Sequence, residues 1–338
     1  MSELDVVVSG LVFHDLVLGL PTPPRPGTEV WATGSNESPG GIANFAVALS
    51  RLGLRTGLAA AFGADDLGDR VWSRLADDEG IDLSLSRRLA GWQTPLTVAL
   101  AYEGDRALVT RGTPPLLSAD ELITAPPAAR AVAAHIGPWP NDWLAKAKAA
   151  GSVVFADVGW DPSEQWDPAV LDQLEHCDVF LPNAAEAMHY TRTHSPAEAL
   201  VRLAELVPLV VVSNGADGAL AMDAGTGERV AVPAHQVQAA DTTGAGDVFA
   251  AGFIAATLWE LSLSERLRFA SLVAAISVTR LGGADAAPRW SDLAAWHQKH
   301  PEDQSLAALL SAHHDRAVNE AVTSAVNGSA DGRNQSER

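Results

Sequence analysis

The chain has 338 residues and a formal net charge of −19 at pH 7, which argues against nucleic acid as its main partner. Hydrophobic residues make up 47% of the sequence, so we expect the main body to fold around a sizeable core. The single cysteine, Cys177, excludes a disulfide framework within one chain, and no apolar run has the length of a membrane span. Because the acidic N-terminus lacks the basic start of a signal peptide, we expect a cytoplasmic protein with no membrane partner.

Apolar runs and alternating patterns predict the strands of the first half of the chain at residues 6–12, 29–34, 58–62, 94–101 and 107–110. Asp15 comes shortly after the first strand, where α/β folds often place ligand groups. Residues 39–44 are expected to open a helix that runs to Leu52 and ends at Gly53. A turn at 103–105 is expected to join the last two strands into a hairpin.

The second half of the chain alternates apolar strands with helices, which is typical of a doubly wound α/β fold. The strands are predicted at residues 132–137, 153–157, 179–183 and 209–213. Each ends in a polar residue or a glycine, at the edge of the sheet where such folds bind ligands. The segment 324–338 is polar and rich in Gly, Asn and Ser, so we expect a disordered tail there.

The heptad Asp-Thr-Thr-Gly-Ala-Gly-Asp at residues 241–247 precedes an apolar helix of small residues. Glycines in such a turn let consecutive N–H groups face outward at a helix N-terminus, where the helix dipole also favours anions. Asp247 would lie in the first helical turn, beside this anion site. A carboxylate there can take a proton from a hydroxyl while the N–H groups hold phosphoryl charge. Alternatively, Asp247 only caps the helix, which is a common role for aspartate.

The heptad resembles the C-terminal signature of the ribokinase-like (PfkB-type) carbohydrate kinases at every position. Residues 40–44 resemble the N-terminal signature of that family, and residues 63–70 are similar to what usually follows it. The family more often has an extra residue between the glycine pair and the asparagine, so we expect a shorter loop here. Asn183 and Glu186 match the N-x-x-E motif of the family. The resemblance covers residues 5–288.

This resemblance implies a three-layer α/β fold around a mainly parallel, doubly wound sheet, with a small β-sheet lid over the substrate. One kinase domain would occupy residues 1–320, and segments at about 12–37 and 92–113 would form the lid. The implied activity is transfer of the γ-phosphoryl group of ATP, with Mg²⁺, to a sugar hydroxyl. The resemblance also allows a homodimer formed through the lid.

The resemblance implies a role for individual residues as well. Asp247 would be the general base. The amides of the anion hole would be those of Gly244, Ala245 and Gly246. The implied sugar contacts are Asp15, Gly40, Gly41, Asn44 and Arg111. The implied contacts to ATP and magnesium are Asn183, Glu186, Ser213, Gly215, Gly218 and Thr242. In part of the family, counterparts of Asp241 and Thr243 help to bind a monovalent cation, which would be K⁺ here.

Other interpretations of the sequence stay open beside the sugar kinase. One is a nucleoside kinase of the same fold, which aromatic rather than polar residues around the acceptor would favour. Another is a sugar-sensing relative that binds without turnover, although the intact Asp247 counts against it. Single residues also have plainer explanations, because Asn183 and Glu186 suit a helix cap and Arg111 suits a solvated arginine.

Overall fold

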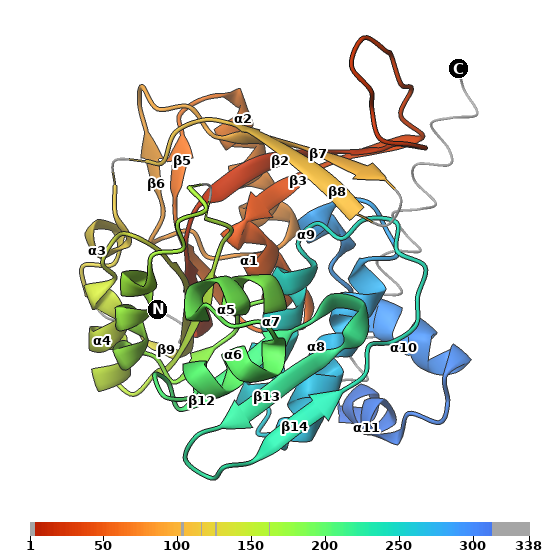
Figure 1. The fold of residues 1–338 in the computed structure, drawn as a ribbon. Coiled ribbons are helices and arrows are strands. Elements are labelled where there is room, and N and C mark those ends of the chain that lie inside the picture. Colours follow the sequence, from red (N-terminus) through yellow and green to blue (C-terminus); the bar gives the residue numbers. More distant parts are fainter. Residues whose placement is uncertain (1–3, 103–104, 116, 126, 162, 313–338) are drawn as a thin grey trace.

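The computed structural model describes residues 4–312 apart from 103, 104, 116, 126 and 162, so the predicted tail at 324–338 lies outside the described residues (Figure 1). The strands of the main sheet are β1 (Leu4–Ser9), β4 (Thr56–Ala59), β9 (Ala129–Ile136), β10 (Val153–Val158), β11 (Val179–Phe180), β12 (Leu209–Ser213), β13 (Ala219–Asp223) and β14 (Arg229–Val232). The other strands are β2 (Val12–Gly19), β3 (Gly34–Gly41), β5 (Ala61–Gly63), β6 (Arg87–Leu89), β7 (Leu96–Tyr102) and β8 (Asp105–Arg111).

The longer helices are α1 (Ile42–Arg51), α2 (Asp66–Ser73), α4 (Asp142–Ala149), α5 (Ala184–Thr191), α6 (Pro196–Leu203), α7 (Ala245–Leu258), α8 (Leu263–Ser277), α10 (Trp290–Lys299) and α11 (Gln304–Ala312). The shorter ones are α3 (Ala119–Leu122), α9 (Gly283–Ala286), the π-helical turn η1 (Arg74–Asp78) and the 3₁₀ segments η2 (Pro168–His176) and η3 (Gly215–Asp217). In the described part of the chain, no helix combines the length and the apolar character needed to cross a bilayer.

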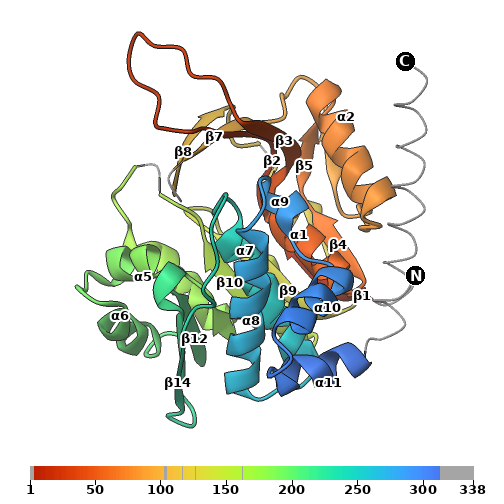
Figure 2. The ribbon, with the colours of Figure 1, turned by 90° about the vertical axis from the view of Figure 1, so that its right-hand side faces the viewer.

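The main sheet has eight strands in the order β14-β13-β12-β11-β10-β9-β1-β4. The strands from β4 to β12 run parallel, while β13 and β14 are antiparallel additions at one edge. Helices α1, α7, α8 and α10 pack on one face of the sheet, and α4, α5 and α6 pack on the other (Figure 2). The predicted three-layer α/β fold around a mainly parallel sheet is therefore confirmed.

Strand β1 shows how the sheet acquires two buried faces. Val6, Val7 and Val8 have no exposed surface, and successive side chains of a strand point to opposite faces. Val6 and Val8 pack in the core that contains α1 and α7, whereas Val7 packs in the core that contains α4 and α5. Because helices cover both faces, this strand is an unbroken apolar run rather than an alternating one.

A second, four-stranded sheet has the order β3-β2-β7-β8. Its strand β2 follows β1 almost directly, so this small sheet lies beyond the carboxyl end of β1 (Figure 1). Strand β2 is antiparallel to β3 and parallel to β7, and β7 is antiparallel to β8. The segments expected to form a lid, 12–37 and 92–113, contain these strands, with β3 continuing beyond the first segment to Gly41.

The strand expected at 29–34 is wrong, because residues 28–33 form no strand and β3 begins only at Gly34. Residues 39–41, expected to open a helix, are the last residues of β3, and α1 begins at Ile42. The sequence of β3 is rich in glycine and polar residues and lacks the apolar alternation that marks a strand. Pairing with β2 along its whole length decides its conformation instead.

Two apolar runs expected to be single strands are each divided. The run 6–12 divides at Gly10 into β1 and β2. A Cβ atom on Gly10 would lie 3.0 Å from Cβ of Ile42, so the chain passes close to α1 where it leaves the main sheet. The run 58–62 divides at Ala60, because β4 belongs to the main sheet and β5 pairs with β6. Tertiary pairing, rather than local hydrophobicity, sets both breaks.

Candidate active site

The heptad 241–247 forms the turn that leads into α7, and Asp247 lies in the first turn of this helix. Gly244 is the N-cap residue with φ 71° and ψ 5°, a left-handed conformation that side chains other than glycine rarely adopt. A Cβ atom on Gly244 would also lie 3.1 Å from Cγ of Asn44. Glycine at this position therefore lets the turn approach Asn44 of α1. The side chain of Asp247 stays 19% exposed, which leaves the carboxylate open to a ligand.

The backbone amides before Asp247 differ in their hydrogen bonding. The amide of Ala245 donates to the carbonyl oxygen of Thr242 at 3.2 Å. The amides of Gly244 and Gly246 donate to no acceptor among the described residues. The space that a side chain on Gly246 would occupy is open within 4 Å. Free N–H groups at the positive end of a helix bind anions, so the turn offers an anion site beside a carboxylate.

Two side chains from other elements contact the carboxylate of Asp247. The amide Nδ2 of Asn44, near the start of α1, donates to Oδ2 at 2.7 Å. Nε2 of His135, near the end of β9, lies 3.5 Å from Oδ1. The sequence predicted a role for Asn44 but not for His135. The available signal was a polar residue next to the end of a buried strand, where α/β sheets carry their ligand groups.

Two buried carboxylates lie close to His135 and Asp247. Asp157 of β10 is 8% exposed and is paired with His135 in the register of β9 and β10. Burial, followed by the charges of Glu186 and Asp247, raises the pKa of Asp157 well above its usual value. Burial also raises the pKa of Glu186 to about 7, although a backbone hydrogen bond from Asn183 opposes this shift. One atom each of His135, Asp157 and Asp247 lie within 4.8 Å of one another, an arrangement that suits a divalent cation.

Five of the six predicted nucleotide contacts gather at the carboxyl ends of β11 and β12, which are neighbouring strands inside the sheet. Asn183 and Glu186 form a capping box at the start of α5, in which each side chain accepts from the backbone amide of the other at 3.0 Å. The helix cap considered from the sequence is thus confirmed. Ser213 forms a β-bridge with Asn183, and the next turn contains Gly215 and Gly218 with φ 52° and 96°. The fold therefore brings these five residues together at the carboxyl ends of two neighbouring strands.

Asp15 belongs to β2 of the small sheet and is 4% exposed. Burial, followed by the charge of Asp247, raises the pKa of Asp15 to about 7, while a hydrogen bond from Thr97 opposes the shift. A side chain on Gly40 in the facing strand would clash with the carboxylate of Asp15, so only glycine leaves room for it. Gly41 follows with φ 63°, where glycine is again favoured. The small sheet thus brings Asp15 within electrostatic reach of Asp247.

Asp241, the first residue of the heptad, is 3% exposed and has both oxygens engaged. Oδ1 accepts from the amide of Thr243 and Oδ2 accepts from the amide of Gly282, each at 2.9 Å. Oγ1 of Thr243 is buried and has no hydrogen-bond partner among the described residues. An unsatisfied buried hydroxyl is costly, so these oxygen atoms fit a cation that would give Oγ1 a partner.

The two arginines of β8 lie at opposite ends of this strand. Arg111, which the sequence predicted as a sugar contact, donates to Oε1 of Gln93 at 2.8 Å. Arg106, which the sequence did not single out, donates to Oγ1 of Thr242 at 2.7 Å. The small sheet therefore touches the heptad through Arg106 rather than through Arg111.

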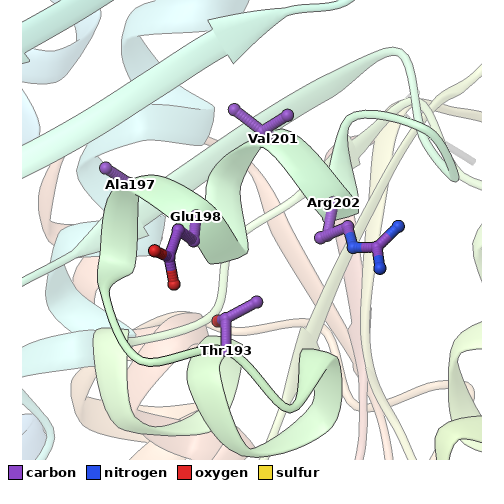
Figure 3. A pocket seen from close by; sticks show the side chains of 5 residues that line it. All are labelled: Thr193, Ala197, Glu198, Val201 and Arg202. Atoms are coloured by element: carbon purple, nitrogen blue, oxygen red, sulfur yellow. The ribbon is translucent and has the colours of Figure 1, made fainter.

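A separate surface pocket lies beside α6 (Figure 3). Its lining residues are Thr193, Ala197, Glu198, Val201 and Arg202. None of them belongs to the predicted site, and all come from α6 or the segment just before it. The cluster around Asp247 therefore remains the candidate active site.

Known proteins with similar sequences fit this geometry. A sequence profile described as pfkB family carbohydrate kinase matches residues 5–290. The ribokinase of Haemophilus influenzae is 27% identical over 300 residues, which cover 84% of this chain and 95% of the relative. A nucleoside kinase of Methanothermobacter thermautotrophicus is 29% identical over 290 residues, which cover 82% of this chain and 91% of the relative.

A solved structure shares the fold. The crystal structure of a putative ribokinase II from E. coli, in complex with ATP and Mg²⁺, has a TM-score of 0.73 and 23% sequence identity. It covers 88% of this chain and 99% of that chain. The expected ribokinase-like fold is thus confirmed. Because the profile spans most of the sequence and both signatures lie at one site, the chain belongs to the pfkB family of carbohydrate kinases, phosphotransferases with an alcohol group as acceptor.

Proposed function

We propose that this protein transfers the γ-phosphoryl group of ATP to a sugar hydroxyl, with Asp247 as the general base. The observation that carries the proposal is the position of Asp247 beside the unpaired amides of Gly244 and Gly246 at the start of α7. Asp247 would take the proton of the hydroxyl as its oxygen attacks the γ-phosphorus, which leaves ADP and the phosphorylated sugar. The amides would hold the charge of the transferring group. The amide of Ala245 would join them by sharing its hydrogen between Thr242 and the phosphate.

On the nucleotide side, the buried carboxylates support binding of Mg²⁺ together with ATP. Bound Mg²⁺ would neutralise phosphate charge, and oxygen atoms are its preferred ligands. Asp157 and Glu186 are buried with raised pKa values, so a cation there would favour their ionised forms, which can act as ligands. The E. coli relative solved with ATP and Mg²⁺ supports the same pair of ligands for this chain. The proposed contacts are Asn183, Glu186, Ser213, Gly215, Gly218 and Thr242.

On the acceptor side, the polar character of the described residues favours a sugar over a nucleoside. Oδ1 of Asn44 and Oγ of Ser38 are buried and have no hydrogen-bond partner among the described residues. Unsatisfied oxygens of this kind suit the hydroxyl groups of a sugar, which can donate to them. Asp15 adds a further buried acceptor. The proposed sugar contacts are Asp15, Gly40, Gly41, Asn44 and Arg111.

A monovalent cation such as K⁺ is proposed beside the anion site. The supporting observation is the buried, unsatisfied Oγ1 of Thr243 next to the buried carboxylate of Asp241. Both residues belong to the heptad that forms the anion turn, so a cation there would stiffen the turn and add positive charge near it.

We further propose one kinase domain over residues 1–320 with the small sheet as its lid, and a homodimer formed through that lid. The outer strand β8 exposes Leu108 and Val109 at 52% and 64%, which supports contact with a second copy.

A cytoplasmic location agrees with the single, buried thiol of Cys177.

The test is ADP release from ATP with Mg²⁺ and a panel of pentoses, hexoses, keto-acid sugars and nucleosides. We expect ADP above the blank only when Mg²⁺ and an acceptor are both present, with a neutral sugar as the best acceptor. A nucleoside as the best acceptor would replace the sugar in this proposal. Absence of ADP with every acceptor would favour a relative that binds sugar without turnover.

A further inference from the structure

His135 was not among the residues that the family signatures predicted, yet it lies beside the proposed base. We propose that His135 is a positioning residue for Asp247: its Nε2 engages Oδ1 while Asn44 holds Oδ2, so that the carboxylate keeps the orientation that accepts the proton. This inference rests on the proposed role of Asp247 as the general base.

The backbone and the ring of His135 are both held in place. His135 lies near the end of β9, between β10 and β1 in the main sheet, and is paired with Asp157. The ring of Phe45 packs against its imidazole edge to face, with centroids 5.3 Å apart and an interplanar angle of 81°. Because Phe45 directly follows Asn44, helix α1 supplies one contact to the carboxylate and one to the imidazole.

The ring nitrogen of His135 that lacks a hydrogen-bond partner in the described part of the chain is the one beside the carboxylate of Asp247. Nε2 of His135 is buried and has no hydrogen-bond partner among the described residues, and Oδ1 of Asp247 lies 3.5 Å away. This separation is just outside the usual range of an N–H···O bond, so a small rotation of either side chain closes it. An unsatisfied buried N–H is costly, so a hydrogen bond from Nε2 of His135 to Asp247 would lower the free energy of the ligand-bound site.

Two contacts fix a carboxylate better than one. With Oδ2 bonded to Asn44 alone, the group can still turn about that hydrogen bond. A second donor on Oδ1 removes this freedom, and each oxygen keeps another lone pair for the proton of the acceptor. Reaction rates depend steeply on such orientation, because displacement by about 1 Å can cost roughly 10²-fold.

The surrounding charges favour the same role. Asp157, Glu186 and Asp247 all act on one another electrostatically, and the charge of His135 opposes the raised pKa of Glu186. An imidazole that donates a proton toward this group offsets part of the mutual repulsion of the carboxylates. A metal ligand role for His135 is the main competing explanation, because one of its ring nitrogens lies within 4.8 Å of carboxylate oxygens of Asp157 and Asp247.

The experiment compares His135→Leu, which removes the donor, with His135→Gln, whose side-chain amide restores one at similar reach. Each variant is made alone and together with Asp247→Asn in the full chain, and kcat and KM are measured with ATP, Mg²⁺ and the best acceptor. His189→Leu is the matched control, because the imidazole of His189 stacks on Trp166 and, among the described residues, forms no hydrogen bond or ion pair with a proposed site residue. Thermal unfolding of every variant identifies folding defects.

We expect His135→Leu to lower kcat by roughly 10- to 100-fold with little change in the KM of ATP, His135→Gln to recover most of the loss, and His189→Leu to behave as wild type. Combined with Asp247→Asn, His135→Leu should have no further effect, because both changes remove the same function. Near-normal kcat in His135→Leu, or losses that multiply in the double variant, would overturn the inference. A loss that excess Mg²⁺ restores would assign His135 to metal binding instead.

The inference and the proposed function fail in different ways. If Asp247→Asn keeps full activity, the base is misassigned and both proposals fall. If Asp247→Asn is inactive while His135→Leu is normal, only the inference falls. The imidazole ¹⁵N resonances of His135, compared between wild type and Asp247→Asn, test the contact without turnover. Unchanged resonances would contradict it.

Discussion

The side-chain amide of Asn44 donates a 2.7 Å hydrogen bond to the carboxylate of Asp247, a residue 203 positions later in the chain. The bond joins the first turns of α1 and α7, which pack side by side against one face of the main sheet. The close approach depends on Gly244, where a Cβ atom would lie 3.1 Å from Asn44. The two family signatures are therefore parts of one site, and each constrains the other.

Asp247→Asn tests the base directly. Asp247 lies in the first turn of α7 and not at its N-cap, and an Asn side chain of the same size can still accept the hydrogen bond from Asn44, so stability should change little. As the base, Asp247 should not be replaceable, and kcat should fall by at least roughly 10²-fold while both KM values change far less. Steady-state kinetics together with thermal unfolding measure this. A variant that melts normally and keeps its kcat would remove Asp247 from the mechanism.

Asn44→Asp places a second carboxylate against Asp247. Two carboxylates at hydrogen-bond distance cannot both ionise easily, so the pair should keep one proton near neutral pH. We expect kcat to fall roughly 10- to 100-fold at pH 7 and to recover toward higher pH, where the proton is lost. The ratio of variant to wild-type kcat, measured from pH 6 to pH 9, shows this as a rising curve.

Asn36→Asp is the control for that experiment, because Asn36 donates to Oδ2 of Asp285 at 3.3 Å and forms no hydrogen bond with Asp247 among the described residues. Its kcat ratio should stay flat over the same pH range. A flat ratio for Asn44→Asp as well would mean that Asn44 does not act through the ionisation of Asp247.

Arg106→Ala tests the contact between the small sheet and the anion turn. Because Arg106 donates to Thr242, we expect its loss to raise the KM of ATP and to lower kcat by about 10-fold, the scale of a charge-assisted contact. Arg111→Ala is the matched comparison on the same strand, since Arg111 bonds Gln93. A rise in acceptor KM for Arg111→Ala would support the role predicted from the sequence. Equal, small effects of both variants would leave neither arginine in the site.

Asp15→Asn tests how much the burial of an ionisable carboxyl group at the proposed acceptor site lowers the stability of the fold. The folded state raises the pKa of Asp15 from 3.8 to about 7. Below about pH 3.8 Asp15 is protonated in both the folded and the unfolded chain, so its burial does not lower the free energy of unfolding through ionisation. As the pH rises toward and through about 7, the unfolded chain ionises more readily than the folded one, and the protein loses stability. Asn stays uncharged, so the variant should be the more stable protein at pH 8, by a difference on the order of 1–4 kcal/mol that narrows toward pH 5.

Denaturant unfolding without ligands, at pH 5, 7 and 8, measures this difference between Asp15→Asn and wild type. Asp172→Asn is the control, because Asp172 is exposed. A stability difference that does not change with pH would mean that Asp15 is not held at a raised pKa.

Local sequence was sufficient for the heptad and for the parallel strands. The glycines and the terminal aspartate of 241–247 predict a tight turn before a helix, and glycine is the residue that most readily adopts the φ of 71° observed at Gly244. The apolar runs of β1, β10 and β12 predict strands covered on both faces, since a strand buried on both sides needs no polar positions. These features depend on neighbours in the chain and on burial alone.

The tertiary structure decided what depends on distant partners. Strand β3 carries no strand pattern of its own and is held by β2. Arg106 reaches Thr242 across 136 residues because the tertiary fold places β8 next to the heptad. His135 meets Asp247 because the register of the sheet and the packing of α7 place the two side chains together. A sequence specifies such contacts only through the whole fold, because the strength of a hydrogen bond or a charge pair depends on distance in space and not on separation along the chain.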